Sequence, residues 1–404
     1  MLLIEMDATA LCALLGLSLV GFIAPLLWFQ ARDNRRASEY LAVFVLIVGV
    51  SLLQTFLLHS GLTRRYPWVS GLGQFLFFAL GPLLFLYTKT LTDREFKFAG
   101  NVAWHFLPVL FSLLLYLPVY LQTTEAKQAA AELYFAQRVS AEDQAYQLAA
   151  LPMASKIYAI QFVALMFHLG SYAVLVLWQL EKHRRRIELV FSDIELINLN
   201  WLRWLNWLVL AVSLISLVFL MLRLFSQDPV SSGGRVVPVL VMFLLIYYAG
   251  WMGVRQPQIY GTQANSSDPG VEGGDSESKY HNTGLSAADA DKHWQRLQHA
   301  MDEEQPYLRS GLTIKQLADT LGMSTAHLSQ VINSRAQVTF FDYINSQRVA
   351  YAQRLLANPD QKKRKVLDIA LSSGFSSESS FYAQFRKHAQ CTPSQYRRQL
   401  QTQR

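Results

Sequence analysis

The sequence predicts an all-α fold: a seven-helix transmembrane bundle, followed by a C-terminal cytoplasmic all-α domain with two helix-turn-helix motifs. Three observations predict it. Seven apolar runs each approach the length of roughly 20 residues at which a helix crosses a bilayer. A polar stretch rich in Gly and Ser follows the last run. Two patterns then each combine an apolar-Ala pair, a turn Gly and a helix with apolar residues four apart.

The apolar runs fill the first 255 residues, which we expect to form a seven-span sensor domain (1–255). The whole chain has 404 residues, of which 52% are hydrophobic and only 16% are charged, a balance that is unusual for a soluble protein. Prolines and glycines fall within several runs, and neighbouring helices can satisfy the backbone groups that they free. The expected spans are 8–29, 39–58, 69–88, 102–121, 157–180, 204–225 and 236–254.

Basic residues in the loops orient this bundle, because cytoplasmic loops carry an excess of Lys and Arg. Eleven basic residues fall in the loops that are cytoplasmic if the N-terminus is outside, and seven fall in the others. The cluster Lys182-His-Arg-Arg-Arg186 is the strongest single anchor. The N-terminus is therefore expected outside and the C-terminal domain in the cytoplasm. The first run has no Lys or Arg before it, so we expect a retained span rather than a cleaved signal.

Residues 256–284 are expected to form a flexible linker, because their Gly, Ser, Asp and Asn content cannot bury a core. A slack tether transmits torque poorly. We therefore expect a signal to reach the C-terminal domain through dimerisation, which raises the effective concentration of two tethered heads.

Positive charge is concentrated in residues 285–404, which hold 16 Lys and Arg against 10 Asp and Glu, within a total net charge of +7. A basic excess beside helix-turn-helix motifs suits a polyanionic partner, and a solvated basic surface is the alternative. The two cysteines, Cys12 and Cys391, lie far apart and have no metal-ligand spacing. We expect no disulfide framework, no metal site and no cofactor.

The first motif, at 313–334, places two short helices around a turn at Gly322, which takes an unusual backbone angle at little cost. Ser324 can cap the second helix. The expected core residues are Leu317, Ala318, Leu321, Leu328, Val331 and Ile332. The candidate DNA contacts are Ser324, Thr325, Ala326, His327, Ser329, Gln330 and Asn333. Gln and Asn can pair with adenine through two hydrogen bonds, whereas an ordinary solvated face is the alternative for each polar residue.

The second motif, at 366–388, has its turn at Gly374 and a cap at Ser376 or Ser377. Its expected core residues are Ile369, Ala370, Phe381 and Phe385. The candidate DNA contacts are Ser376, Ser377, Glu378, Ser379, Ser380, Tyr382, Gln384, Arg386 and Lys387. A basic run between the motifs is expected to contact phosphates, with a solvated loop as the alternative: Lys362, Lys363, Arg364 and Lys365.

These residues resemble the AraC/XylS family of transcription regulators over about 285–400. The resemblance rests on Ile369-Ala370, Gly374-Phe375-Ser376-Ser377, Phe381, Phe385-Arg386-Lys387, Thr392-Pro393-Ser394, Tyr396-Arg397 and the joining helix from Phe340 to Leu356. It implies an all-helical domain whose two recognition helices enter successive major grooves on one face of double-stranded DNA. The family often has Gly after each motif. Here Gln337 and Gln390 stand there, so either Gln adopts a left-handed backbone or the turn differs.

Together these features predict a sequence-specific DNA-binding transcription regulator that is anchored in the bacterial inner membrane and couples a membrane or external signal to gene expression. The expected partners are double-stranded DNA, the lipid bilayer, RNA polymerase, an unknown signal ligand and a second copy of the chain. The alternative is a membrane receptor or transporter with an accessory DNA-binding head. An enzyme is not expected and no residue is assigned a catalytic role, because the sequence has no phosphate-cradling Gly-rich loop, zinc-protease helix or nucleophile elbow.

Five polar side chains fall in or near the expected spans. Such residues are either ligand contacts or bridges between helices, because a polar group in lipid needs a partner. They are Gln54, Gln74, His105, Gln161 and His168.

Overall fold

The computed structural model describes residues 7–30, 35–69, 71–93, 96, 100–128, 153–195, 197–225, 232–255, 285–361 and 364–402. These residues form helices and no strand, apart from one isolated antiparallel bridge between Phe191 and Thr313. The chain divides into two compact units, Met1–Glu181 with Leu199–Gly261, and Lys182–Asn198 with Thr262–Arg404. The expected linker 256–284 lies outside the described residues, and the domain boundaries at 255 and 285 stay predictions.

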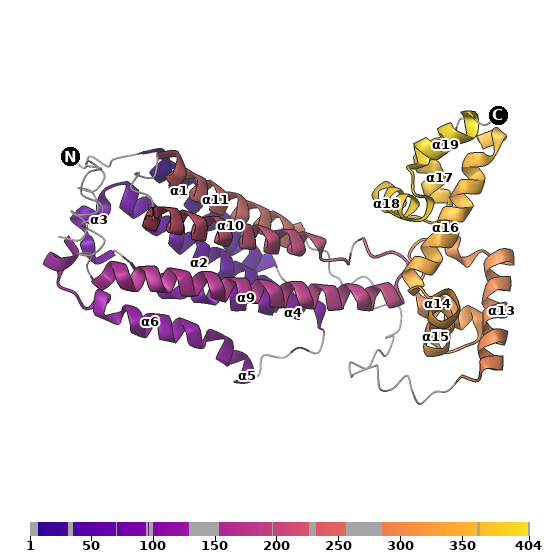
Figure 1. The fold of residues 1–404 in the computed structure, drawn as a ribbon, viewed down its shortest axis with the longest axis horizontal. Helices are drawn as coiled ribbons and strands as arrows, with labels where there is room; N and C mark the ends of the chain where they lie inside the picture. The colour runs from indigo at the N-terminus through magenta and orange to yellow at the C-terminus, as the bar shows by residue number, and fades with distance from the viewer. Residues whose placement is uncertain are drawn as a thin grey trace. The chain divides into compact units, whose positions relative to one another are not determined.

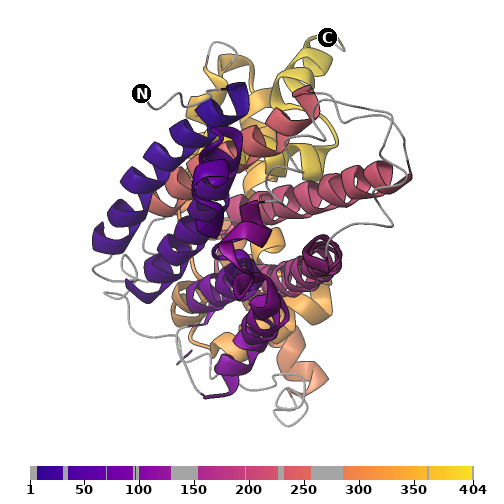
Figure 2. The ribbon, with the colours of Figure 1, turned by 90° about the vertical axis from the view of Figure 1, so that its left-hand side faces the viewer.

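The first unit is a bundle in which α1 packs on α2 and α11, and α2 packs on α4 (Figures 1 and 2). Small residues allow this close packing. A β-carbon added at Gly250 would lie 2.5 Å from Ile23. The helices are α1 (Ala8–Gln30), α2 (Arg35–His59), α3 (Leu62–Arg65), η1 (Pro67–Val69), η2 (Gln74–Ala79), α4 (Leu80–Thr92), α5 (Gly100–Ala103), η3 (Trp104–Phe106), α6 (Leu107–Tyr120), α9 (Met153–Val190), α10 (Asn200–Phe225) and α11 (Ser232–Arg255).

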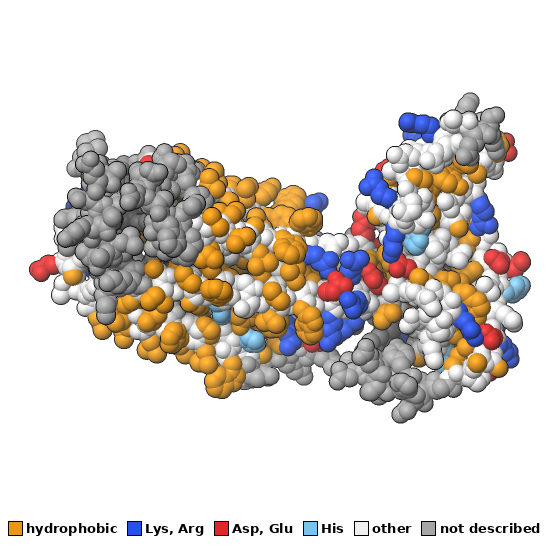
Figure 3. Space-filling model, in the orientation of Figure 1, with side chains coloured by type: hydrophobic (Ala, Val, Ile, Leu, Met, Phe, Trp, Pro, Cys, Tyr) orange, Lys and Arg blue, Asp and Glu red, His pale blue; other side chains and the backbone are white. Residues whose placement is uncertain are grey.

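Within the residues that the structure describes, five segments are long and apolar enough to cross a membrane, fewer than the seven expected spans. They are Ala8–Phe29, Arg36–His59, Pro67–Thr92, Ala159–Val190 and Asn200–Val218, whereas the apolar helices Trp104–Tyr120 and Val239–Arg255 are shorter. The expected span 102–121 is divided because η3 ends at Phe106 and α6 starts afresh with Pro108 in its first turn. Many hydrophobic side chains lie on the face of this unit that Figure 3 shows. Phe22, Phe29 and Phe167 are 69%, 84% and 70% exposed.

The polar residues inside the bundle bridge its helices. The amide of Gln74 donates to Gln54 at 2.9 Å, and the amide of Gln161 donates to the carbonyl oxygen of Ser112 at 2.8 Å. His105 Nδ1 lies 2.6 Å from the hydroxyl of Tyr172, and His168 Nε2 lies 2.9 Å from the carbonyl oxygen of Phe78. Of the two roles considered for these five residues, the structure shows the bridging one.

The second unit has two hydrophobic cores that share one helix. Leu297, Leu317, Leu328 and Ile344 belong to the first core, and Val349, Ile369 and Phe381 to the second. The shared helix is α16, which contributes Ile344 to one core and Val349 to the other. The helices are α13 (Ala287–Glu303), η4 (Pro306–Leu308), α14 (Ile314–Leu321), α15 (Thr325–Ala336), α16 (Phe340–Ala357), η5 (Pro359–Gln361), α17 (Val366–Ser372), α18 (Glu378–Ala389) and α19 (Pro393–Thr402).

Local sequence signals set the ends of the two helix-turn-helix units. Thr313 and Gln316 form a capping box at the start of α14, and Gly322 ends that helix with a φ of 60°. The Ser324 side chain accepts from the backbone N–H of His327 and caps α15, as expected. Ser376 and Ser377 were both possible caps of α18. Ser377 caps the helix, since its hydroxyl accepts a hydrogen bond from the backbone N–H of Ser380. Every expected core residue of both motifs is buried.

Gln337 and Gln390 both adopt a left-handed backbone, each with a φ of 57°, at the ends of α15 and α18. The structure thus selects the left-handed backbone over a different turn at both positions. A side chain with a β-carbon is strained in this region, and glycine is not.

Replacing Gln337 with Gly is therefore expected to stabilise the second unit by roughly 0.5–1 kcal/mol. The change in stability would be measured by heating the protein and using hydrogen exchange of the α15 peptides to follow unfolding. The same substitution at Gln353, inside α16, should instead destabilise by a similar amount, because glycine weakens a helix interior. A loss of stability at both positions would contradict the strain argument.

Candidate nucleic-acid interface

The outer face of α15 carries Ala326, Ser329, Gln330 and Asn333, which are spaced at i, i+3, i+4 and i+7 and therefore share one side of the helix. The opposite side is buried: Leu328 and Ile332 belong to the first core, and Val331 is buried beside them in the sequence. Short and amide side chains thus project together from a helix whose other side is fixed in the core. This geometry suits insertion into a major groove.

The remaining candidates of the first motif lie around this face. His327 turns toward α13, where its ring stacks on His293 with a centroid separation of 6.0 Å and an interplanar angle of 27°. Thr325 is exposed in the first turn, directly after the capping Ser324. The structure therefore groups Ala326, Ser329, Gln330 and Asn333 and separates His327 from them.

The outer face of α18 carries Ser379 and Arg386, both exposed, on the side opposite the buried Phe381 and Phe385. Ala383 lies between them at helical spacing and is also exposed. Ala383 is not among the residues predicted from the sequence, although the same helical spacing that placed Phe381 and Phe385 in the core would have put it on this face.

Three other candidate DNA contacts of the second motif have side chains that are buried or bonded within the second unit. Tyr382 packs against the second core, with its ring 6.0 Å from that of Phe381. The side-chain oxygen of Gln384 is buried. The ammonium of Lys387 forms an ion pair with Asp342 of α16, which reduces the charge that it can offer to a phosphate. Glu378 is exposed at the first position of α18, and Ser380 is half-buried.

The basic run between the motifs is described only in part, because Lys362 and Lys363 lie outside the described residues. Arg364 is directed onto α17, where its guanidinium donates to the carbonyl oxygen of Asp368 at 3.2 Å and to the hydroxyl of Ser372. Lys365 is exposed at the N-terminal end of α17. Of the two described residues, Lys365 is thus the better placed for phosphate contact.

Two carboxylates of the second unit lie at the start of α18. The hydroxyl of Ser376 donates to Asp193, and the hydroxyls of Ser377 and Ser379 both donate to Glu195. All three serines are candidate DNA contacts. Carboxylates are stabilised at a helix N-terminus by the same unpaired N–H groups and dipole that favour phosphate there. Asp193 and Glu195 were not predicted from the sequence, because no local pattern connects them with a helix more than 180 positions later.

A buried arginine holds the segment that carries these carboxylates. Arg348 of α16 is 1% exposed, and it donates to the carbonyl oxygens of Tyr307 at 2.7 Å and Arg309 at 2.8 Å. It also donates to the carbonyl oxygen of Ser192 at 3.2 Å and to its hydroxyl at 3.1 Å. Burial lowers the pKa of the Arg348 guanidinium to about 10, and the nearby Asp193 carboxylate opposes that shift. Arg348 is therefore charged at neutral pH.

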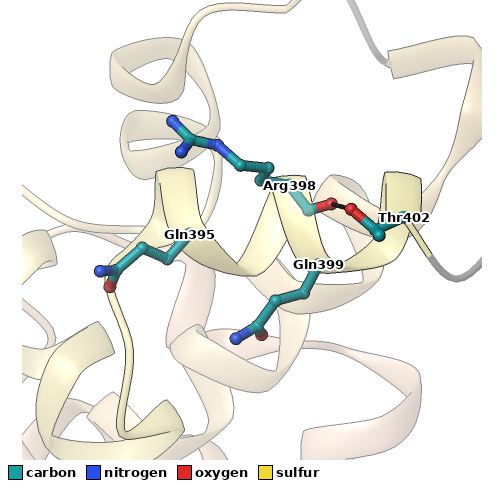
Figure 4. A pocket seen from close by; sticks show the side chains of 4 residues that line it. All are labelled: Gln395, Arg398, Gln399 and Thr402. Atoms are coloured by element: carbon teal, nitrogen blue, oxygen red, sulfur yellow. Dashed lines mark hydrogen bonds between the residues drawn. The ribbon is translucent and has the colours of Figure 1, made fainter.

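A hollow of about 400 Å³ lies on α19 and is lined by Gln395, Arg398, Gln399 and Thr402 (Figure 4). All four residues come from one helix, and the hydroxyl of Thr402 donates to the carbonyl oxygen of Arg398 at 3.1 Å. The hollow is a local feature of one helix surface. Within the described residues, no group of three or more His, Cys, Asp or Glu is arranged to hold a metal ion.

Comparisons with known proteins match parts of this chain. A family described as a helix-turn-helix domain matches residues 317–399. The melibiose operon regulatory protein of Escherichia coli K12 is 33% identical over 93 residues, which are 23% of this chain and 30% of that protein. The virulence regulon transcriptional activator VirF of Yersinia enterocolitica is 34% identical over 103 residues, which are 26% of this chain and 36% of that protein.

This chain thus spans about a third of the length of each of these two relatives. A solved structure of a protein of unknown function from Listeria innocua matches with 30% identity over 25% of this chain and 94% of that chain, at a TM-score of 0.23. The C-terminal region contains a helix-turn-helix domain of the AraC type. The names of these two relatives describe a regulatory protein of an operon and a transcriptional activator of a regulon.

Proposed function

We propose that the chain is a sequence-specific DNA-binding transcription regulator anchored in the bacterial inner membrane, where it couples a membrane or external signal to gene expression. The observation that carries the proposal is a pair of capped helix-turn-helix units joined by α16, each with an outward-facing second helix. The bound polymer is duplex DNA, with α15 and α18 in successive major grooves. Base contacts come from the outer faces, and phosphate contacts come from the helix starts and Lys365.

The membrane part of the proposal is supported by the five long apolar segments and by the exposed hydrophobic side chains that cover the first unit. A soluble protein rarely exposes so large an apolar surface. We propose seven spans in all, with the two shorter apolar helices also crossing the bilayer, the N-terminus outside and the C-terminal head in the cytoplasm. The interior polar residues have partners in the bundle, so they give no support to a transporter.

The proposal is tested by crosslinking the full-length protein to DNA in cells, sequencing the captured fragments, and measuring binding of the enriched fragment to protein in lipid nanodiscs. We expect selective retention of that fragment, with affinity that falls steeply as salt rises because phosphate binding releases counterions. Equal retention of random duplexes would contradict the proposal.

Gln330 is expected to read a base, because it lies in the middle of the outer face of α15. Replacing Gln330 with Ala should weaken binding to the enriched fragment by about tenfold, since a two-pronged amide–base pair contributes roughly 1–3 kcal/mol of discrimination. Binding to random DNA should change little. The matched control is Gln298→Ala on α13, an exposed glutamine outside both motifs, which should leave both affinities unchanged. Equal losses on specific and random DNA would mean that Gln330 reads no base.

A further inference from the structure

We infer that the segment from Ser192 to Glu195 is an intramolecular competitor of DNA at the second recognition helix. The inference rests on the proposed function and adds a mode of regulation to it. The segment follows directly after α9, which ends at Val190, and it belongs to the same compact unit as the two helix-turn-helix motifs.

The competition follows because the hydroxyl donors at the start of α18 are already bonded to carboxylates. Ser377 and Ser379 direct their hydroxyls at one carboxylate, Glu195, and Ser376 directs its hydroxyl at Asp193. A DNA phosphate would use the same hydroxyls and the same N-terminal turn of α18, because it too is an anion that accepts hydrogen bonds. The carboxylates and a phosphate therefore exclude one another, by occupancy and by charge repulsion.

The base of the segment is anchored firmly. Ser192 is 1% exposed, its N–H donates to the carbonyl oxygen of Leu312 at 3.1 Å, and Asn345 donates to its carbonyl oxygen at 3.1 Å. Phe191 pairs with Thr313, at the start of the first motif. This anchor keeps the two carboxylates beside α18 at a high effective concentration.

The outer end of the segment is exposed and can detach. Glu195 is exposed, and the side-chain contacts described for it are those with Ser377 and Ser379. Asp193 is half-buried and also accepts from the N–H of Glu195 at 3.1 Å, which fixes a local turn. Withdrawal of Glu195 would thus free the start of α18 without dismantling the Arg348 anchor.

The competitor covers one of the two recognition helices. Among the described residues, no carboxylate accepts a hydrogen bond from the side chains of Ser329, Gln330 or Asn333 on α15. The covered state therefore leaves the first motif available and blocks the second, so that the head holds DNA through half of its interface. Because α9 starts inside the first unit, a change in that helix reaches Glu195 along continuous chain, without passing through residues 256–284.

The test compares Glu195→Gln with Glu188→Gln in the full-length protein in lipid nanodiscs. Both changes remove one negative charge, but Glu188 pairs with Arg184 on α9 and has no described bond to α18. Affinity for the DNA enriched in cells is measured for each. If Glu195 leaves the start of α18 uncovered only about a tenth of the time, Glu195→Gln raises the apparent affinity for DNA about tenfold. Glu188→Gln leaves this affinity near the value of the parent protein.

A second measurement needs no DNA. Hydrogen exchange of the backbone amides of residues 378–380 should quicken in Glu195→Gln and stay unchanged in Glu188→Gln, because the carboxylate no longer shields that turn. Unchanged affinity and exchange in Glu195→Gln, with selective DNA binding intact, would overturn the inference and leave the proposed function standing. Weaker DNA binding by Glu195→Gln would overturn it too. If neither the parent protein nor either variant binds any DNA sequence selectively, the proposed function is wrong and the inferred competition is wrong with it.

Discussion

Replacing Gly374 with Ala is expected to destabilise the second unit by about 3 kcal/mol or more. Gly374 has a φ of 87°, a backbone region in which a β-carbon is strained. An added β-carbon would also lie 2.5 Å from the carbonyl oxygen of Tyr307 and 2.9 Å from the Cα of Leu308. These atoms belong to the backbone of η4, which cannot move away as the tip of a flexible side chain can.

The turn of the first motif provides the matched control. Gly322 has a φ of 60°, but among the described residues beyond its chain neighbours an added β-carbon there would lie within 4 Å only of the Arg296 side chain, at 3.6 Å. Gly322→Ala should therefore cost about 1 kcal/mol, the strain alone. Hydrogen exchange of the α14–α18 peptides in increasing urea, in the full-length protein, would measure both values. Equal losses at the two glycines would show that the contact with η4 is unimportant.

Replacing Arg348 with Met is expected to destabilise the same unit by roughly 3–5 kcal/mol. The methionine fills much of the arginine volume but leaves the buried carbonyl oxygen of Tyr307, and the carbonyl oxygen of the exposed residue Arg309, without their guanidinium donor. Each unpaired buried carbonyl costs about 1–3 kcal/mol. Ser192 loses two donors as well, so the segment that carries Glu195 should be held less tightly.

Arg354→Met is the control for this change, on the same helix. Its guanidinium is exposed and donates to the hydroxyl of Tyr307 at 3.3 Å, so the loss should stay below about 1 kcal/mol. Urea-dependent hydrogen exchange distinguishes the two variants. The Arg348 network would be shown to contribute little if both arginines gave the same small loss.

The two helix-turn-helix units were largely predictable, because their signals are local. Ala318 is small where two helices cross, Gly322 takes the left-handed angle, and Ser324 caps the next helix. Each property depends on a few consecutive residues, so periodicity and capping rules are sufficient to place them. The DNA contacts assigned from the same pattern stay predictions.

The apolar bundle was predictable in composition but not in element length. Hydropathy marks where a chain avoids water, yet it does not show where a helix breaks. The third expected span, 69–88, lies within a longer apolar segment that is interrupted at Gly71 and Gly73, both with a positive φ, before α4 begins at Leu80. A β-carbon at Gly73 would also lie 2.7 Å from Val50, a crowding that only the packed neighbours reveal.

By itself, the sequence determined the all-α class, the two helix-turn-helix units, the Ser324 cap and the motif cores, because these follow from patterns within a turn or two of chain. Only the tertiary structure decided that Gln337 and Gln390 take the left-handed angle, that His327 faces α13, and that Glu195 lies on Ser377 and Ser379. Such pairings join residues that are distant in sequence. Their partners are fixed by how whole helices pack, which no local pattern specifies.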